Sequence, residues 1–131
     1  MNRQITAAAL ALVTALPVVA CSSKGKIEAP VAQNVCFHAI PMSDGTVKFN
    51  KLKENVPNIE SCASALEGMR LQFLRIGGQM QEIMGAYNTQ FLFLQKEGVF
   101  VSTEYNGNRY LLLVRTGDGR LAMVGAMPQG Q

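Results

Sequence analysis

The chain has 131 residues, of which 48% are hydrophobic and 16% charged, and its net charge is +3 at pH 7. This length is enough for one small domain with its own core. The charge is too small to indicate a nucleic-acid-binding protein, and no aromatic residue interleaves with the cluster Lys48, Lys51 and Lys53. We interpret that cluster as a solvated face and expect no nucleic-acid partner.

The first residues have the pattern of an export signal. Residues 1–4 are short and basic, and residues 5–20 form an uncharged apolar run that contains Pro17. The run is shorter than the roughly 20 apolar residues of a membrane-spanning helix, and Pro17 would break a helix near its end. We therefore predict that residues 1–20 are a signal peptide rather than a single-pass anchor.

The end of this signal, Val18-Val19-Ala20-Cys21, resembles the lipobox of bacterial lipoproteins. The resemblance implies that Cys21 becomes the first mature residue, with a diacylglycerol on its sulfur and a further acyl group, such as palmitate, on its amino end. Several acyl chains anchor stably, because each buried methylene contributes about 0.8 kcal/mol. Ser22 stands where an Asp tends to retain such proteins at the inner membrane, which favours the periplasmic face of the outer membrane. The alternative is an ordinary secretory signal that contains a cysteine.

Residues 21–34 are predicted to be a lipidated flexible tether, since they are rich in small and polar residues and include Pro30. A single small domain is predicted over residues 35–131. Within it, Ser43-Asp44-Gly45 has the composition of a turn that precedes a short strand at residues 46–49.

Two cysteines remain besides Cys21. In an exported chain, Cys36 and Cys62 suggest one disulfide, which would close a loop of roughly 25 residues and contribute about 3 kcal/mol. The alternative is two buried free thiols. Together with His38 they give too few ligands for a metal site, and there is no CxxC or HxxxH pair, so we expect no metal and no cofactor.

The clearest helix is predicted over residues 59–76. Apolar residues recur there at alternating steps of three and four, the spacing of one helix face, at Ile59, Cys62, Leu66, Met69, Phe73 and Ile76. Asn58 is the expected N-cap, and Gly77-Gly78 the expected stop. Gly68 lies inside the helix, where we interpret it as a close approach to a sheet.

After Gly78 the hydrophobic period changes to two. Strands are predicted at 81–87, 90–95, 99–105, 109–116 and 120–126, separated by the turns Glu97-Gly98, Asn106-Gly107 and Asp118-Gly119. The predicted fold is therefore α+β: a short N-terminal strand, one amphipathic helix, and an antiparallel meander of four to five strands.

The register of these turns leaves both faces of the predicted sheet apolar. It places Leu94 opposite Val101, and Phe100 opposite Leu113. At the edge, Glu104 lies opposite Arg109 as an ion pair. One face suits the helix. The other is the candidate protein-interaction face, and it carries Phe91, Phe93, Phe100, Leu111 and Leu113.

A single helix covers only one face, and three exposed phenylalanines would make a larger apolar patch than monomers usually tolerate. Three covers are open for the second face. The sheet could curl into a small barrel, or the segment at 35–49 could fold across it. Alternatively, a second copy of the chain or a protein partner could cover it.

No catalytic set is recognisable. His38, Ser43 and Asp44 are close in sequence, but a triad is defined by geometry, and there is no GxSxG or HExxH pattern. We predict that the protein is not an enzyme but a lipid-anchored envelope lipoprotein, an accessory or protein-interaction subunit that binds a protein partner or itself. The alternative is a small periplasmic ligand-binding or enzyme-inhibitor domain, which needs a concave cavity with convergent polar groups.

Overall fold

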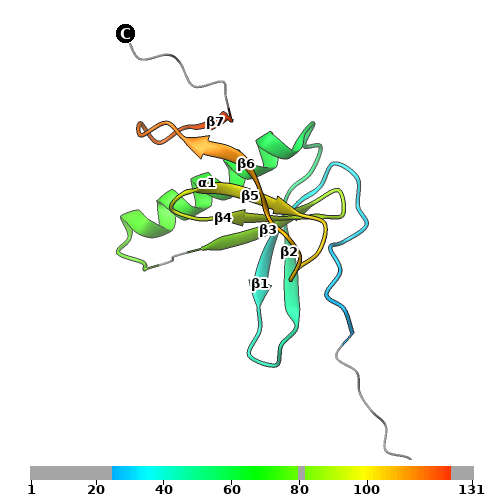
Figure 1. Cartoon of the computed structure of the whole chain (residues 1–131). Helices are drawn as coiled ribbons and strands as arrows, with labels where there is room; N and C mark the ends of the chain where they lie inside the picture. Colours follow the sequence, from blue (N-terminus) through cyan, green and yellow to red (C-terminus); the bar gives the residue numbers. More distant parts are fainter. Residues whose placement is uncertain (1–24, 80–81, 125–131) are drawn as a thin grey trace, which may run out of the picture.

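The computed structural model describes residues 25–79 and 82–124, so the predicted signal and Cys21 lie outside the described residues. The elements are β1 (Cys36–Pro41), β2 (Val47–Lys53), α1 (Ile59–Arg75), β3 (Ile83–Tyr87), β4 (Gln90–Leu94), β5 (Gly98–Ser102), β6 (Tyr110–Arg115) and β7 (Leu121–Met123). The strands form one sheet in the order β2-β1-β3-β4-β5-β6-β7, and α1 packs against one of its faces (Figure 1).

The α+β class is confirmed, but the prediction of four to five strands is too low. The meander comprises β3 to β7, and the predicted single N-terminal strand is a hairpin, β1–β2, that joins the same sheet through an antiparallel pairing of β1 with β3. All seven strands therefore share one antiparallel hydrogen-bonding network.

The helix begins at the predicted residue. The Asn58 side-chain oxygen accepts hydrogen bonds from the Ser61 backbone N–H at 2.8 Å and from the Ser61 hydroxyl at 2.7 Å. This cap satisfies an amide that the first turn leaves without a partner. Arg75 lies in the last turn, where its positive charge interacts favourably with the negative end of the helix dipole. Gly77, at a φ of +86°, ends the helix.

The inward side of α1 and one sheet face form the helix-side core. Its buried members are Cys36, Val56, Cys62, Ala63, Leu66, Ile83, Tyr87, Leu92, Leu94, Val99 and Leu113. The close approach belongs to Gly85 of β3, where an added Cβ would lie 2.3 Å from Leu66 Cδ1 and 2.7 Å from the Phe37 carbonyl oxygen. The interpretation of Gly68 was wrong, because nothing lies within 4 Å of a Cβ built there.

All three turns of the meander differ from the predicted register: at the β6–β7 turn, Val114 was expected opposite Met123 but lies opposite Ala122. The β4–β5 turn is centred one residue earlier than predicted, so Leu94 faces Val99 rather than Val101. A slip of two residues in pairing keeps every side chain on its predicted face. Between β5 and β6 a bulge shifts the pairing: Phe100 faces Leu111, but Val99 faces Leu113.

The bulge inserts one extra residue into β6, and this reverses the faces of the residues beyond it. Leu113 therefore lies in the helix-side core, and its assignment to the candidate interaction face was wrong.

The opposite sheet face forms a second cluster, here called the Phe-side core. Its buried residues are Ala29, Ala39, Met84, Ala86, Phe91 and Phe93. The ring centroids of Phe49 in β2 and Phe91 in β4 lie 6.3 Å apart, although two strands separate β2 from β4. Neighbouring strands are about 4.8 Å apart, so a flat sheet would separate β2 from β4 by about 14 Å. The sheet is therefore strongly curled, and the β1–β2 hairpin folds over this face.

The chain before β1 belongs to the same packing. Ala29 is buried in the Phe-side core and Ile27 packs against it. The Asn34 backbone N–H donates to Asn88 Oδ1 at 2.8 Å. The predicted flexible tether is therefore wrong for residues 25–34. The small and polar composition of this segment suggested a tether, but its apolar residues Ile27 and Ala29 pack against the sheet.

Candidate functional site

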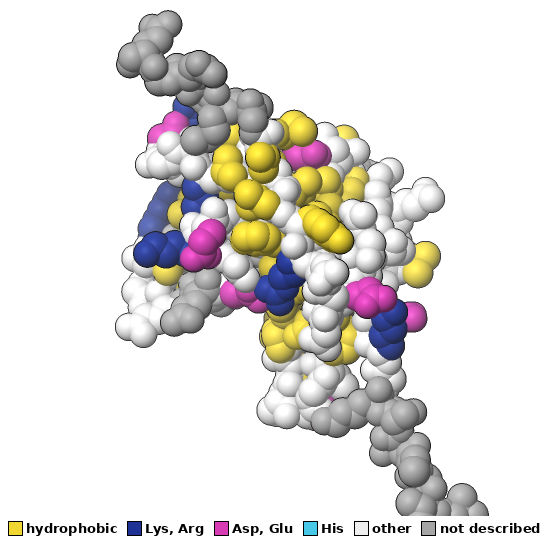
Figure 2. Space-filling model, viewed as in Figure 1, with side chains coloured by type: hydrophobic (Ala, Val, Ile, Leu, Met, Phe, Trp, Pro, Cys, Tyr) yellow, Lys and Arg dark blue, Asp and Glu magenta, His cyan; other side chains and the backbone are white. Residues whose placement is uncertain are grey.

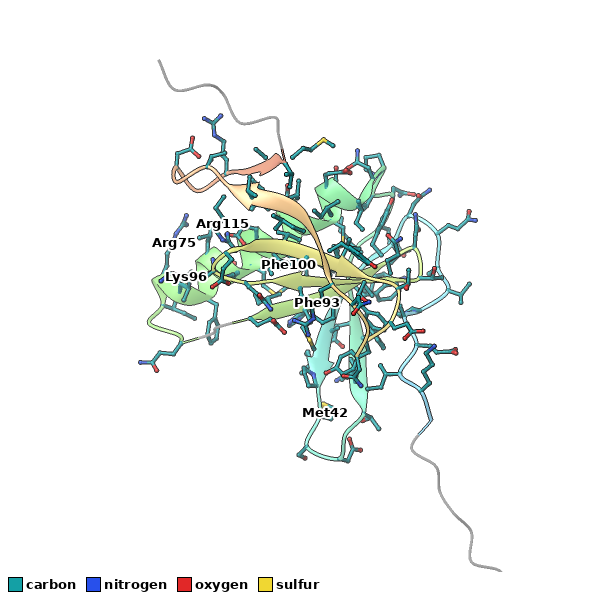
Figure 3. The ribbon with its side chains drawn as sticks, viewed as in Figure 1. Met42, Arg75, Phe93, Lys96, Phe100 and Arg115 are labelled. Carbon is teal, nitrogen blue, oxygen red and sulfur yellow. A yellow bond between two sulfur atoms is a disulfide. The ribbon has the colours of Figure 1, made fainter. Side chains whose placement is uncertain are left out.

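Most of the candidate interaction face is buried. Phe91 and Phe93 are 2% and 0% exposed, Phe100 is half-buried, and Leu113 lies in the other core. Figure 3 shows Phe93 and Phe100 close together on the paired strands β4 and β5. Of the five predicted residues, only Leu111 is an exposed side chain, at 44%. Three ways to cover this face were considered above. Curling of the sheet and the folding across of the β1–β2 hairpin both contribute to its burial.

The ring of Phe93 is covered by an arginine. The Arg109 guanidinium carbon lies 3.5 Å from the centroid of that ring, and its Nη1 donates to Glu82 at 3.1 Å. The predicted cross-strand pair of Arg109 with Glu104 was wrong, because β6 begins only at Tyr110. Glu104 instead pairs with Lys26.

Four exposed large apolar side chains lie on β6, on β7 or directly after β7, and others lie elsewhere on the surface, such as Val31 and Ile76. We define the β6–β7 patch as Tyr110, Leu111, Met123 and Val124, which are 65%, 44%, 56% and 57% exposed. Figure 2 shows hydrophobic side chains gathered over β5 and β6 in this view. Sequence reasoning missed three of the four, because it assigned residues to sheet faces and did not consider which strand would end the sheet.

The two edges of the sheet differ in chemistry. The β2 edge carries the exposed lysines Lys48, Lys51 and Lys53, and charge of this kind discourages another strand from pairing with an edge. The β7 edge has the sequence Leu121-Ala122-Met123, with no charge and no proline, and within the described residues it pairs only with β6. Within the described residues, the β7 edge is therefore the one without charges that would discourage strand addition.

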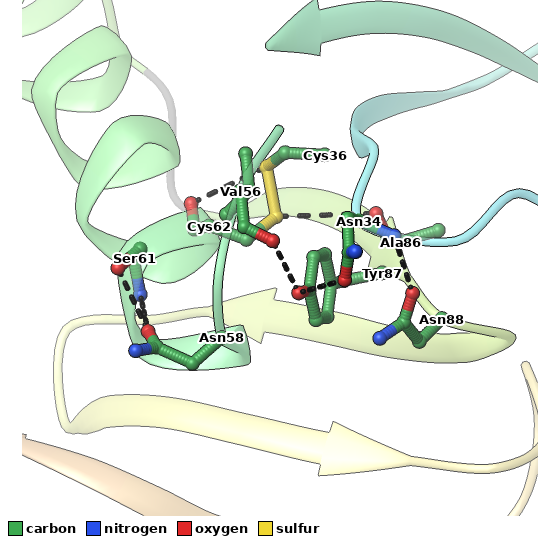
Figure 4. Close-up of a disulfide and its surroundings, with 9 residues drawn as sticks. All are labelled: Asn34, Cys36, Val56, Asn58, Ser61, Cys62, Ala86, Tyr87 and Asn88. Carbon is green, nitrogen blue, oxygen red and sulfur yellow. Dashed lines mark hydrogen bonds between the residues drawn. A yellow bond between two sulfur atoms is a disulfide. The ribbon is translucent and has the colours of Figure 1, made fainter. Parts of the chain in front are cut away.

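The disulfide is confirmed and joins β1 to α1. Cys36 and Cys62 are bonded, with Cα atoms 5.3 Å apart (Figure 4). Beside the bond, the Tyr87 hydroxyl donates to the Val56 carbonyl at 2.6 Å, and the Val56 N–H donates to the Asn34 carbonyl at 2.8 Å. These contacts fix the start of β1, the segment before α1 and the end of β3 in one unit.

A groove of about 360 Å³ lies between α1 and the β6–β7 turn. It is lined by Ser64, Glu67, Gly68, Leu71, Gly119, Arg120 and Leu121. Glu67 is only 4% exposed. Its Oε1 lies 3.3 Å from Arg70 and also contacts Arg115, while its Oε2 has no hydrogen-bond partner among the described residues.

Asp44, which is close in sequence to His38 and Ser43, forms its side-chain hydrogen bonds within its own turn. The Asp44 carboxylate accepts hydrogen bonds from the Thr46 N–H at 2.9 Å and the Thr46 hydroxyl at 2.6 Å, which lowers the pKa of Asp44. Burial lowers the pKa of His38. Within residues 25–79 and 82–124, no three His, Cys, Asp or Glu side chains gather as metal ligands.

Among the same residues, no helix has both the length and the apolar character needed to cross a membrane. Comparisons with protein-family models, with curated protein sequences and with solved structures give no match for this chain.

Proposed function

We propose that this chain is a bacterial envelope lipoprotein, anchored by lipid on Cys21 at the periplasmic face of the outer membrane. In this proposal it acts as a non-enzymatic accessory subunit that binds another protein. The lipobox-like segment supports export and lipidation. The bond between Cys36 and Cys62 supports the same compartment, because disulfides persist in oxidising environments and are rare in the cytosol.

One observation carries the interaction role: the exposed β6–β7 patch lies next to an edge strand without charge. Both apolar faces of the central strands β3 and β4 are buried, under α1 on one side and under the curled hairpin and the segment before β1 on the other. A partner strand that paired with β7 and continued beyond Met123 along β6 would gain main-chain hydrogen bonds and cover Tyr110 and Leu111. Phe93, in contrast, is core and is not proposed to contact a partner.

Site-specific crosslinking tests this role. A photoreactive amino acid is placed at Leu111 in cells that make the protein, and in a control at the exposed Lys48 on the opposite edge. We expect a discrete adduct from position 111 and none from position 48. An adduct of twice the chain mass would identify the partner as a second copy. Equal labelling from both positions, or none from 111, would contradict the proposal.

The anchor has a separate test. Cells are fed a clickable palmitate analogue, and the protein is purified from the membrane fraction. Label is expected on the wild type and not on Cys21→Ser. Mass spectrometry should find Cys21 as the first residue. A chain that still starts at Met1 would overturn the anchor while leaving the crosslinking result intact.

The groove beside Glu67 favours ligand binding as a second candidate function. It is concave and has polar groups from both α1 and the β6–β7 turn. A small molecule bound there would raise the melting temperature of the protein. The rise should disappear in Gly68→Leu, whose side chain would occupy the groove. A ligand that stabilises both proteins equally binds elsewhere.

A further inference from the structure

The segment before β1 leaves little chain between the lipid and the domain. Ile27 and Ala29 pack against the Phe-side core, and Lys26 Nζ lies 3.0 Å from Glu104. Described structure therefore begins at Gly25, only four residues after Cys21. Whatever conformation residues 22–24 take, four Cα–Cα steps of 3.8 Å hold the two Cα atoms within about 15 Å of each other.

We propose that the β1–β2 hairpin end of the domain faces the lipid surface, an inference that rests on the proposed lipidation of Cys21. The reason is the position of Gly25. It lines one cavity together with Asp44, Gly45 and Thr46 of the hairpin turn. It lines a second with Glu104, Tyr105 and Asn106 of the β5–β6 loop. A lipid within about 15 Å of Gly25 brings both turns to the membrane.

The hairpin turn has side chains suited to a headgroup layer. Its exposed residues are Pro41, Met42, Ser43, Asp44, Gly45 and Thr46. Met42, which is 45% exposed, is the large apolar side chain among them, and Figure 3 places it at the outer end of the hairpin. One methionine does not drive insertion into the acyl core, so the contact is at headgroup depth, with the lipid on Cys21 providing the anchoring energy.

This orientation determines what the rest of the molecule can reach. In Figure 1 the β1–β2 turn and the start of the described chain lie at one end, and β7 lies at the other. With the hairpin end at the lipid, β7 and its free edge lie on the side of the domain away from the membrane. A protein partner can then add to β7 without competing with the lipid surface.

The chain has no tryptophan, so a single introduced tryptophan reports on one position. Met42→Trp probes the hairpin and Met123→Trp is the matched control at the opposite end, since both methionines are about half exposed. Each acylated protein is reconstituted into vesicles of phosphatidylethanolamine and phosphatidylglycerol that contain a headgroup-spin-labelled phosphatidylcholine. Only protein that floats with the vesicles is measured.

Several-fold stronger quenching of Met42→Trp than of Met123→Trp is expected. Equal quenching, or stronger quenching of Met123→Trp, in protein that floats would overturn the orientation and leave the lipid anchor standing. Protein that does not float, as expected for Cys21→Ser, would overturn the anchor and this inference with it. Inserting about eight Gly and Ser residues after Lys24 should remove most of the difference, because a longer flexible tether frees the domain to rotate.

Discussion

The Arg109 guanidinium lies over the ring of Phe93, 3.5 Å from its centroid, and this ring belongs to the Phe-side core. A cation over an aromatic face contributes about 0.5–2 kcal/mol, more as it is desolvated. The Glu82 carboxylate, 3.1 Å from Arg109 Nη1, holds the guanidinium in place. Phe93, which the sequence analysis placed on the candidate interaction face, is thus covered by the side chain of Arg109.

We expect Arg109→Ala to lower the free energy of unfolding by about 0.5–2 kcal/mol, because the ring of Phe93 loses its cover. Urea unfolding followed by circular dichroism measures this loss. The exposed Lys48→Ala is the control and should change stability by less than about 0.5 kcal/mol. Equal effects from the two variants would mean that the contact contributes nothing.

Reduction of the disulfide should destabilise the protein by about 2–4 kcal/mol, because Cys36 and Cys62 are 26 residues apart and their bond restricts the unfolded chain. Melting with and without dithiothreitol measures the effect. The double variant Cys36→Ala/Cys62→Ala should melt at a lower temperature and ignore the reductant. A wild type that melts at the same temperature in both conditions would contradict this prediction.

Two glycines should respond in opposite directions to alanine. Gly68→Ala is expected to stabilise by about 1 kcal/mol, since alanine favours a helix interior and a Cβ there meets nothing within 4 Å. Gly85→Ala should destabilise by about 1–3 kcal/mol, because its Cβ would overlap Leu66 and the Phe37 carbonyl. Thermal melts of the two variants test this prediction. A change in melting temperature in the same direction for both would contradict the packing around Gly68 and Gly85.

Removing the charge of the buried Glu67 carboxylate is expected to lower the free energy of unfolding. Glu67→Gln leaves Arg70 and Arg115 without their shared partner, and breaking a buried pair in this way costs about 3 kcal/mol or more. Chemical denaturation measures this loss in the free energy of unfolding. Asp118→Asn, which breaks the exposed pair with Arg120, is the control and should leave the midpoint unchanged.

Stability should fall as the pH is lowered from about 8 to about 5, through the ordinary pKa of the histidine. Burial lowers the pKa of His38 below its usual 6.5, so the unfolded chain binds this proton more readily than the folded one. The loss begins near 6.5 and stops growing below the folded pKa. Because His38 is the single histidine, His38→Asn should flatten the melting temperature over this range. An unchanged slope in that variant would assign the effect to other groups.

Several elements were predictable because their signals are local. The helix from Ile59 was visible in its apolar spacing and its Asn58 cap. The disulfide was predicted from two cysteines that follow a predicted export signal. The turns at Lys96-Glu97 and Asp118-Gly119 lay within one residue of their predicted places, since turn composition is set by backbone angles that few residues adopt.

Other features depended on contacts between distant segments. The bulge that moves Leu113 to the helix side was not predictable from the Asn106-Gly107 turn. The burial of Ile27 and Ala29, and the salt bridge from Glu67 to Arg115, join residues far apart in sequence. No local sequence pattern predicts such a contact, because each of these side chains could equally well be exposed to solvent.

The sequence by itself determined that this chain forms a helix and apolar strands joined by short turns, since spacing, caps and turn residues act over a few positions. Only the tertiary structure decided which apolar face stays exposed. Curling brings Phe49 of β2 onto Phe91 of β4 and buries the aromatic face that a flat sheet would display. Apolar side chains are exposed instead at the end of the sheet, where β7 pairs with β6 on one side and with no other strand among the described residues.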